Sequence, residues 1–323
     1  MRILVTGGAG YIGSITCRVL LDAGHDVTVL DTLEKGHRWA VDERARLVVG
    51  DVGDAAACAE ALADVESVLH CAGYIEVAES EKEPEKYYEN NVTRPQVLLE
   101  TMRACGVTSL VFSSTAAVYG EPSEIPVTED APLRPVNVYG KSKARFEELL
   151  DDAERVWGLR SVRLRYFNVA GAMHEAGLGE AHTPETHIIP RVLGAMAAGV
   201  REFEVYGGDY PTPDGTCIRD YIHVLDLGDA HRRALQYLEA GGETAVCNLG
   251  NGRGYSNREV VRTCAEVTGA EVTTVIGPRR EGDPAVLIAS AKRAGALLGW
   301  KPRLSGLRTI ISDAWQWHQM AEH

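Results

Sequence analysis

A glycine-rich turn near the start of the chain restricts the possible folds more than any other feature of the sequence. An apolar run at residues 3–6 precedes the turn, and a segment of helical spacing at residues 12–23 follows it. The turn contains three glycines, Gly7, Gly10 and Gly13. In a strand–turn–helix unit the first glycine allows the tight turn, the second lets a pyrophosphate approach the backbone, and the third lets the helix pack against the strand. The pattern predicts a βαβ unit that binds a dinucleotide.

A carboxylate ends the next apolar run, at residues 27–30. Asp31 stands at the distance from the glycine turn that is typical of a residue bound to the adenosine ribose. Its carboxylate accepts hydrogen bonds from the ribose hydroxyls and repels a 2′-phosphate. The sequence therefore favours NAD over NADP as the cofactor, although a capping or loop role for Asp31 remains the alternative.

The rest of the chain continues the alternation of strand and helix. Apolar runs at 47–49, 67–72, 109–113 and 161–166 alternate with helical patterns at 55–62, 88–105 and 138–156. Such alternation predicts an α/β fold with a Rossmann-like, doubly wound parallel sheet. Loop-rich composition after residue 170 predicts a smaller, interleaved C-terminal α/β substrate lobe. We expect residues 1–170 to form the NAD-binding domain and residues 171–323 to form most of the substrate lobe, with residues 221–238 returning to the first domain.

Charge and cysteine content exclude several classes of protein. The 33 Lys and Arg residues against 46 Asp and Glu residues leave a net charge of −13, which disfavours nucleic acids and anionic membranes as partners. An anionic ligand then requires a local positive pocket. The seven cysteines are scattered and form no Cys-x-x-Cys motif, which is typical of a reduced compartment. No apolar run reaches the roughly 18 residues of a membrane span, and we expect a cytoplasmic protein without a signal peptide.

A phenol, an ammonium group and a pair of hydroxyls are candidates for proton transfer. Tyr139 and Lys143 are four residues apart, so they share one face of the predicted helix. A nearby ammonium group favours the phenolate form of a tyrosine and makes it a usable base. Ser114 and Thr115 follow an apolar strand, at the edge of a parallel sheet where ligands bind. An exposed helix pair and an ordinary turn are the alternatives, but together these groups suit hydride and proton transfer at an alcohol carbon.

Several motifs carry a family resemblance. Residues 6–13, 112–120 and 139–143 resemble the extended short-chain dehydrogenase/reductase family, and within it the chain resembles the UDP-glucose 4-epimerases. The second resemblance extends through residues 165–168, 215–224, 248–250, 279–283 and 298–300. It implies an isomerase that inverts carbon 4 of a UDP-hexose through a transient 4-keto sugar with tightly bound NAD. It also implies a homodimer.

The resemblance implies roles for individual residues. Tyr139 would be the acid/base, Lys143 its electrostatic partner, and Thr115 the hydroxyl that contacts the sugar. The cofactor contacts would be Gly7, Gly10, Tyr11, Ile12, Gly13, Asp31, Thr32, Asp51, Val52, Cys71, Ala72, Asn90, Ser113, Tyr139, Lys143 and Phe167. The substrate contacts would be Thr115, Tyr139, Asn168, His187, Tyr206, Arg219, Arg280, Asp283 and Leu287. The two arginines would supply the positive pocket that a diphosphate needs in an acidic protein.

Five positions depart from the usual pattern of the family. Cys71 and Ile75 stand where an aromatic residue and a lysine are usual near the cofactor, and Tyr206 replaces a phenylalanine near the uracil. His187 stands at an asparagine position and its charge is expected to vary with pH. Leu287 matches a tyrosine that narrows the sugar pocket in some relatives, so we expect room for UDP-N-acetylhexosamines.

Individual residues also bear on three alternative functions and on a metal site. An epimerase for UDP-glucuronate or a UDP-pentose remains possible. A 4,6-dehydratase needs an acidic pair where this chain has Ala116 and Ala117. A non-catalytic NAD-sensing protein would not need the proton-transfer residues. His182 and His187 flank Glu185, but Pro184 interrupts the helical spacing of metal ligands and favours a loop surface, so no metal is expected.

Overall fold

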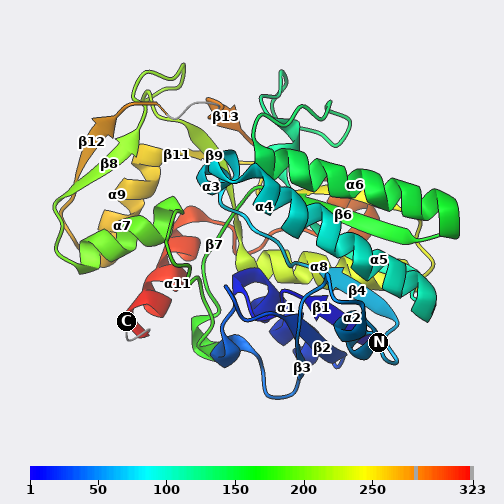
Figure 1. Ribbon diagram of the computed structural model, residues 1–323. Helices are drawn as coiled ribbons and strands as arrows, with labels where there is room; N and C mark the ends of the chain where they lie inside the picture. The colour runs from blue at the N-terminus through cyan, green and yellow to red at the C-terminus, as the bar shows by residue number, and fades with distance from the viewer. Residues whose placement is uncertain (280–282, 321–323) are drawn as a thin grey trace.

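The larger part of the chain is built on a seven-stranded sheet (Figure 1). The structure is a computed structural model that describes residues 1–279 and 283–320. The strand order is β10-β6-β5-β4-β1-β2-β3, and each neighbouring pair is parallel. The strands are β1 (Arg2–Thr6), β2 (Asp26–Asp31), β3 (Arg46–Val49), β4 (Ser67–His70), β5 (Ser109–Thr115), β6 (Arg160–Tyr166) and β10 (Ala245–Leu249). The predicted α/β fold with a parallel sheet is confirmed.

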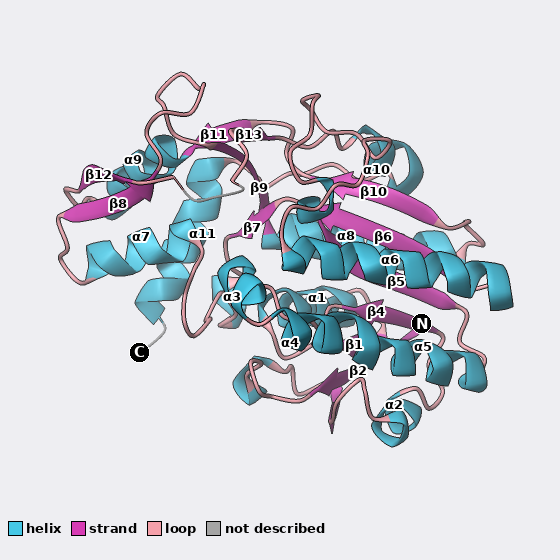
Figure 2. Cartoon of the chain, turned by 45° about the horizontal axis from the view of Figure 1, so that its top comes forward, coloured by secondary structure: helices cyan, strands magenta, loops and turns pink. Residues whose placement is uncertain are grey.

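Helices cover both faces of this sheet (Figure 2). They are α1 (Tyr11–Asp22), α2 (Ala55–Ala61), α3 (Val77–Lys82), α4 (Pro84–Tyr88), the π-helix η2 (Glu89–Thr93), α5 (Arg94–Cys105), α6 (Val138–Trp157), α8 (Val224–Glu239) and α10 (Lys292–Leu298). Successive residues of a strand point to opposite faces. Ile3 and Val5 therefore pack with α1 and α8, whereas Leu4 packs with α2, α5 and α6. Burial on both faces explains why the strands are apolar throughout.

The second part of the chain forms a smaller lobe beside the carboxyl edge of the sheet. Its strands are β7 (Asn168–Ala170), β8 (Glu202–Tyr206), β9 (Ile218–His223), β11 (Gly254–Ser256), β12 (Thr273–Gly277) and β13 (Val286–Leu287). Its helices are α7 (Ile188–Ala197), α9 (Asn257–Thr268) and α11 (Leu307–Met320). β9 lies between β11 and β13 and also pairs with β7, while β8 pairs with β12. The short 3-10 helices η1 (Arg38–Ala40), η3 (Ala116–Tyr119) and η4 (His174–Ala176) complete the described structure.

The sheet changes direction between β1 and β4. From β1 the chain continues outward to β2 and β3, and it then crosses back to β4, β5 and β6 on the other side. In open parallel sheets this arrangement opens a crevice at the carboxyl ends of the strands, where ligands bind. Among the described residues, none of the helices is long and apolar enough to cross a membrane.

Candidate functional site

A cavity of about 830 Å³ lies at the carboxyl edge of the sheet and continues into the smaller lobe. Residues that directly follow or end several strands line it, including Gly7 after β1, Thr32 after β2 and Thr115 at the end of β5. The other predicted site residues that line it are Gly10, Tyr11, Ile12, Gly13, Asp31, Asp51, Val52, Cys71, Ala72, Asn90, Tyr139, Phe167, Asn168, His187, Arg219, Asp283 and Leu287. The fold therefore brings residues from both lobes to one cavity.

Some predicted residues do not line the cavity. The amine of Lys143 lies beneath the surface of the cavity, where it donates a hydrogen bond to the Ser113 carbonyl oxygen at 3.1 Å. Ser113 is buried as well, and Tyr206 at the end of β8 does not line the cavity either. Arg280 lies outside the described residues. Ile75, the residue at the usual lysine position, lines the cavity with 38% of its surface exposed.

The glycine turn leaves no room for side chains. Gly7 has a φ of +71°, and a Cβ on Gly13 would lie 2.1 Å from the Gly7 carbonyl oxygen. Gly10 precedes α1, and no side chain caps the first backbone N–H groups of that helix. Free N–H groups at a helix N-terminus bind anions, and the helix dipole strengthens the attraction. The turn therefore fits a dinucleotide pyrophosphate.

Asp31 has a structural role in addition to its predicted role. Its carboxylate accepts hydrogen bonds from the backbone N–H of Ala9 at 3.0 Å and of Leu33 at 2.8 Å. These bonds hold the glycine turn against the end of β2. A carboxylate has about four lone-pair sites, so Asp31 retains capacity for the hydroxyls of a ribose.

Two of the proton-transfer residues, Thr115 and Tyr139, line the cavity, and Lys143 lies beneath its surface. Thr115 ends β5, and Tyr139 lies in the first turn of α6 with 8% of its surface exposed. Lys143 follows one helical turn later, and its amine lies 4.9 Å from the centre of the Phe112 ring. The spacing that the sequence indicated therefore places the phenol and the amine on the same side of α6.

Burial changes the pKa of both groups. It raises the pKa of Tyr139 to about 12, although a hydrogen bond with Thr115 opposes the increase. It also lowers the pKa of Lys143 to about 8, although the charges of Cys71 and Glu147 oppose the decrease. Desolvation thus opposes the activation of the phenol that the ammonium group of Lys143 is expected to provide.

The far end of the cavity lies in the smaller lobe. Arg219 on β9 pairs with Asp283 and also donates a hydrogen bond to the Ile218 carbonyl oxygen at 2.8 Å. Two predicted substrate residues thus bind each other. The sequence did not indicate Tyr221, which is two residues from Arg219 and therefore on the same face of β9. Its residue lines the same cavity, and its phenol oxygen is buried without a hydrogen-bond partner.

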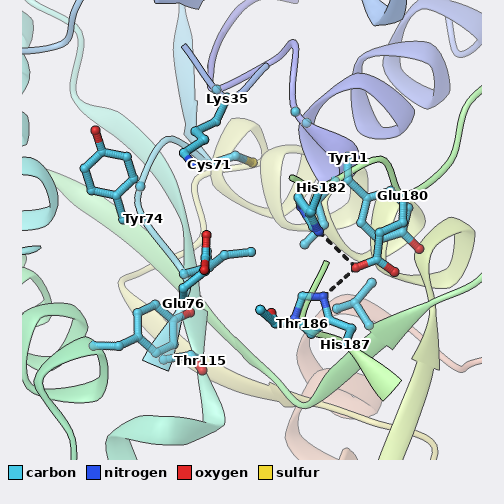
Figure 3. A pocket seen from close by; sticks show the side chains of 18 of the residues that line it. Tyr11, Lys35, Cys71, Tyr74, Glu76, Thr115, Glu180, His182, Thr186 and His187 are labelled. Carbon is cyan, nitrogen blue, oxygen red and sulfur yellow. Dashed lines mark hydrogen bonds and ion pairs between the residues drawn. The ribbon is translucent and has the colours of Figure 1, made fainter. Parts of the chain in front are cut away.

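Two imidazoles and two carboxylates form a cluster in which Glu180, His182 and His187 line the cavity and Glu185 lies next to them. Figure 3 shows Glu180 between the two imidazoles. His182 Nδ1 lies 3.1 Å from Glu180 Oε1, and His187 Nδ1 lies 2.5 Å from the same oxygen. Burial alone would lower the pKa of His187, but Glu180 and Glu185 raise it to about 9. Its charge is therefore constant at neutral pH, contrary to the expectation. The sequence did not indicate Glu180, although the pattern Glu-x-His-x-x-Glu-x-His was visible.

Comparisons with known proteins agree with this geometry. The profile of the NAD dependent epimerase/dehydratase family matches residues 3–250. The chain belongs to this family. It is 49% identical to a UDP-glucose 4-epimerase from Lacticaseibacillus casei, over 99% of this chain and 97% of that protein.

Solved structures of similar proteins match the whole chain of this family member. A UDP-glucose 4-epimerase from Brucella ovis in complex with NAD is 44% identical, with a TM-score of 0.94 over 97% of both chains. A UDP-Glc/GlcNAc 4-epimerase from Campylobacter jejuni is 40% identical, with a TM-score of 0.86 over 99% of both chains. The family's fold is thus shared across both lobes.

A buried network that the sequence did not indicate positions the end of β5 in this family member. Ser114 donates a hydrogen bond to Glu147 Oε1 at 2.6 Å, and Arg165 donates to the same oxygen at 3.0 Å. Arg165 also donates to the Tyr119 hydroxyl at 3.0 Å, which in turn donates to Asn248 at 2.6 Å. The network connects β5 to α6, β6 and β10. It therefore fixes the position of Thr115, the catalytic candidate that follows Ser114 at the end of β5.

A second network lies under the cofactor end of the cavity. Ser113 Oγ lies 2.8 Å from His231 Nε2 and 3.2 Å from Cys71 Sγ, and His231 Nδ1 lies 2.9 Å from the Leu227 carbonyl oxygen. Burial lowers the pKa of His231 to about 4, so the ring is neutral. His231 therefore acts as a structural link between α8 and β5.

Proposed function

We propose that this chain is a UDP-glucose 4-epimerase that uses NAD to invert carbon 4 of the hexose. One observation carries the proposal: a single cavity joins the glycine turn to Arg219 and presents Thr115 and Tyr139 between them. The first end suits a dinucleotide and the second a diphosphate. The likeness to curated UDP-glucose 4-epimerases over nearly the full chain supports the same reaction.

Different residues of the chain have different roles in the proposed reaction. When bound, NAD supplies a nicotinamide that takes up the hydride from carbon 4 and later returns it. Tyr139 removes the proton from the 4-hydroxyl group, and Thr115 contacts that hydroxyl. Since burial keeps the phenol protonated at neutral pH, Tyr139 needs the positive charge of Lys143 and of the nicotinamide to act as a base. Tyr139 then returns the proton to the oxygen on carbon 4 of the turned sugar, whose opposite face would receive the hydride.

Inversion requires the 4-keto sugar to turn over between the two transfers. This is possible when the binding energy is concentrated in the UDP group and the sugar is held loosely. Arg219, Tyr221 and Arg280 are proposed to bind the diphosphate, with Asp283 releasing Arg219 when substrate enters. Asn168 and His187 are proposed to add further contacts. The remaining predicted cofactor and substrate residues keep their proposed roles.

The test is a reaction without added cofactor. Purified protein is incubated with UDP-galactose, and the product is followed by proton NMR. We expect UDP-glucose to form until equilibrium is reached, and a parallel sample with added NAD shows whether cofactor was lost in purification. Absence of UDP-glucose in both samples would contradict the proposal. Turnover only with UDP-glucuronate or a UDP-pentose would favour those epimerases, and a 4-keto-6-deoxy product would indicate a dehydratase.

UDP-N-acetylhexosamines are proposed as further substrates. Leu287 lines the cavity with a side chain smaller than the tyrosine that narrows the pocket in some relatives. One similar structure is named a UDP-Glc/GlcNAc 4-epimerase. Leu287→Tyr is expected to lower kcat/KM for UDP-N-acetylglucosamine at least about tenfold more than for UDP-galactose, because the larger ring fills the space for the acetyl group. Equal losses for both substrates would contradict this assignment.

The finer biological setting is also a proposal. We propose a cytoplasmic homodimer that acts in galactose metabolism. All seven cysteines are free, as in a reduced compartment. A groove lined by residues of α4, η2 and α6 includes Tyr88 and Leu133, whose surfaces are 38% and 40% exposed. A second copy of the chain would cover these apolar groups. Sedimentation equilibrium of the wild type and of Leu133→Glu tests this face. A Leu133→Glu protein that remains as dimeric as the wild type would contradict it.

A further inference from the structure

Four side chains with metal-binding atoms converge in one short segment of the smaller lobe. Glu180, His182, Glu185 and His187 each offer one ligand atom, and these atoms all lie within 4.8 Å of one another. Both imidazoles direct Nδ1 toward the same oxygen of Glu180, as Figure 3 shows. Glu185 approaches the same ring nitrogens, with Oε2 3.8 Å from His182 Nδ1 and Oε1 3.6 Å from His187 Nδ1. The ligand atoms of the four residues therefore form one compact group.

The separations are near those of a tetrahedral metal site. Zinc binds imidazole nitrogen and carboxylate oxygen at about 2.0–2.2 Å, so tetrahedral ligand atoms lie about 3.4 Å apart. The nitrogen–oxygen separations are 2.5 and 3.1 Å to Glu180 Oε1, and 3.6 and 3.8 Å to the two oxygens of Glu185. One ligand atom from each residue lies within 4.8 Å of the other three, so shifts of up to about 1.4 Å would bring all four to the required distance. We propose that Glu180, His182, Glu185 and His187 bind one Zn²⁺ ion on the wall of the substrate cavity.

The chemistry of the ligands selects the metal. Two imidazoles and two carboxylates suit zinc, whereas magnesium and calcium prefer sites made of oxygen alone. The two carboxylates neutralise the charge of a divalent ion. Ring coordination through Nδ1 fixes the remaining proton of His187 on Nε2, so the ring stays a hydrogen-bond donor. The metal is therefore compatible with the substrate contact proposed for His187.

The position of the segment indicates what the metal does. The Glu180 carbonyl oxygen accepts a hydrogen bond from Trp317 of α11 at 3.0 Å. The Ala181 carbonyl oxygen lies 3.0 Å from His37 Nε2, at the cofactor end of the cavity. Residues 180–187 thus connect α11 to the cofactor side, and Pro184 excludes a regular helix from the segment. We infer that zinc holds this segment in shape as a wall of the cavity and does not take part in proton transfer.

Zinc binding is tested on the full chain with its NAD. The protein is treated with EDTA, dialysed and titrated with Zn²⁺ by calorimetry, with Mg²⁺ in a second titration. We expect one zinc ion per chain and no binding of magnesium. Titration with Co²⁺ is expected to produce the intense visible absorption of tetrahedral cobalt. Absence of zinc binding, or weak absorption typical of octahedral cobalt, would overturn the proposal.

Variants assign the ion to this cluster. His182→Ala and Glu185→Gln are each expected to lower the zinc affinity at least about tenfold. Glu175→Gln, an exposed carboxylate in the preceding η4 turn, is the matched control and should bind zinc as the wild type does. Unchanged affinity in both cluster variants would refute the assignment.

A spectroscopic measurement on the wild type does not depend on the folding of variants. The zinc K-edge absorption spectrum should report two imidazoles and two oxygen ligands. A shell that contains sulfur, or six oxygen atoms, would place the metal elsewhere in the chain.

Discussion

Lys143 is expected to reduce the stability of the protein when no cofactor is bound. Its side chain is 3% exposed, and burial lowers its pKa from 10.5 to about 8. The ammonium group donates one hydrogen bond to a protein atom, the Ser113 carbonyl oxygen, at 3.1 Å. The proposed reaction requires the positive charge of Lys143 at a buried position where few groups of the folded protein stabilise it. Replacement by methionine, which retains the apolar length of the side chain, should therefore stabilise the cofactor-free protein.

The magnitude follows from the pKa. A difference of one in pKa is worth about 1.4 kcal/mol, so the change from 10.5 to about 8 corresponds to about 3 kcal/mol. The unfolded chain binds the proton more tightly, so this penalty is complete below pH 8 and disappears above pH 10.5. The lost hydrogen bond costs about 1 kcal/mol. Lys143→Met should thus stabilise the protein by about 2 kcal/mol at pH 7.

The assay is equilibrium unfolding by urea of both proteins freed of NAD, at pH 7 and pH 10. At pH 10 the penalty falls to about 1 kcal/mol, so the variant and the wild type should be about equally stable. Lys141→Met, an exposed lysine on the same helix, is the control and should change the free energy of unfolding by less than about 0.5 kcal/mol. A Lys143→Met protein that is less stable than the wild type at pH 7, with no dependence on pH, would refute the reasoning.

Three further substitutions test the site and its support. Tyr139→Phe removes the proposed base and should lower kcat about 10²–10⁴-fold while UDP affinity, measured by calorimetry, stays within about threefold; undiminished turnover would reassign the base. Gly13→Ala places a Cβ 2.1 Å from a backbone oxygen and should abolish NAD binding. Gly295→Ala, whose Cβ lies 3.6 Å from its nearest atom, should leave NAD binding unchanged. The absorbance of bound cofactor in the purified proteins measures both effects. Glu147→Gln leaves the buried Arg165 without its counter-charge and should lower the free energy of unfolding in urea by about 3–5 kcal/mol. Glu148→Gln, in an exposed ion pair, should lower it by less than about 0.5 kcal/mol. Similar losses in both variants would contradict the argument from burial.

Local patterns were sufficient to predict the fold class and the order of its elements. The glycine turn, the period of the strands and the four-residue spacing of Tyr139 and Lys143 depend on neighbouring residues only. The predicted strand at residues 161–166, for example, is β6 (Arg160–Tyr166). The predicted helix at 138–156 is α6 (Val138–Trp157). These features are set by residues that are close together in the sequence, so their prediction did not require the tertiary structure.

Protonation and long-range partners could not be derived in this way. The pKa of Tyr139 depends on how completely α6 and the strands exclude water from it, which no spacing reveals. The pairing of Arg219 with Asp283 joins residues 64 positions apart. The cluster around Glu180 forms because the segment folds back on itself in a loop that helical periodicity does not describe. Amino-acid order thus specified which chemical groups are present, whereas burial and the meeting of distant segments set their charge and their partners.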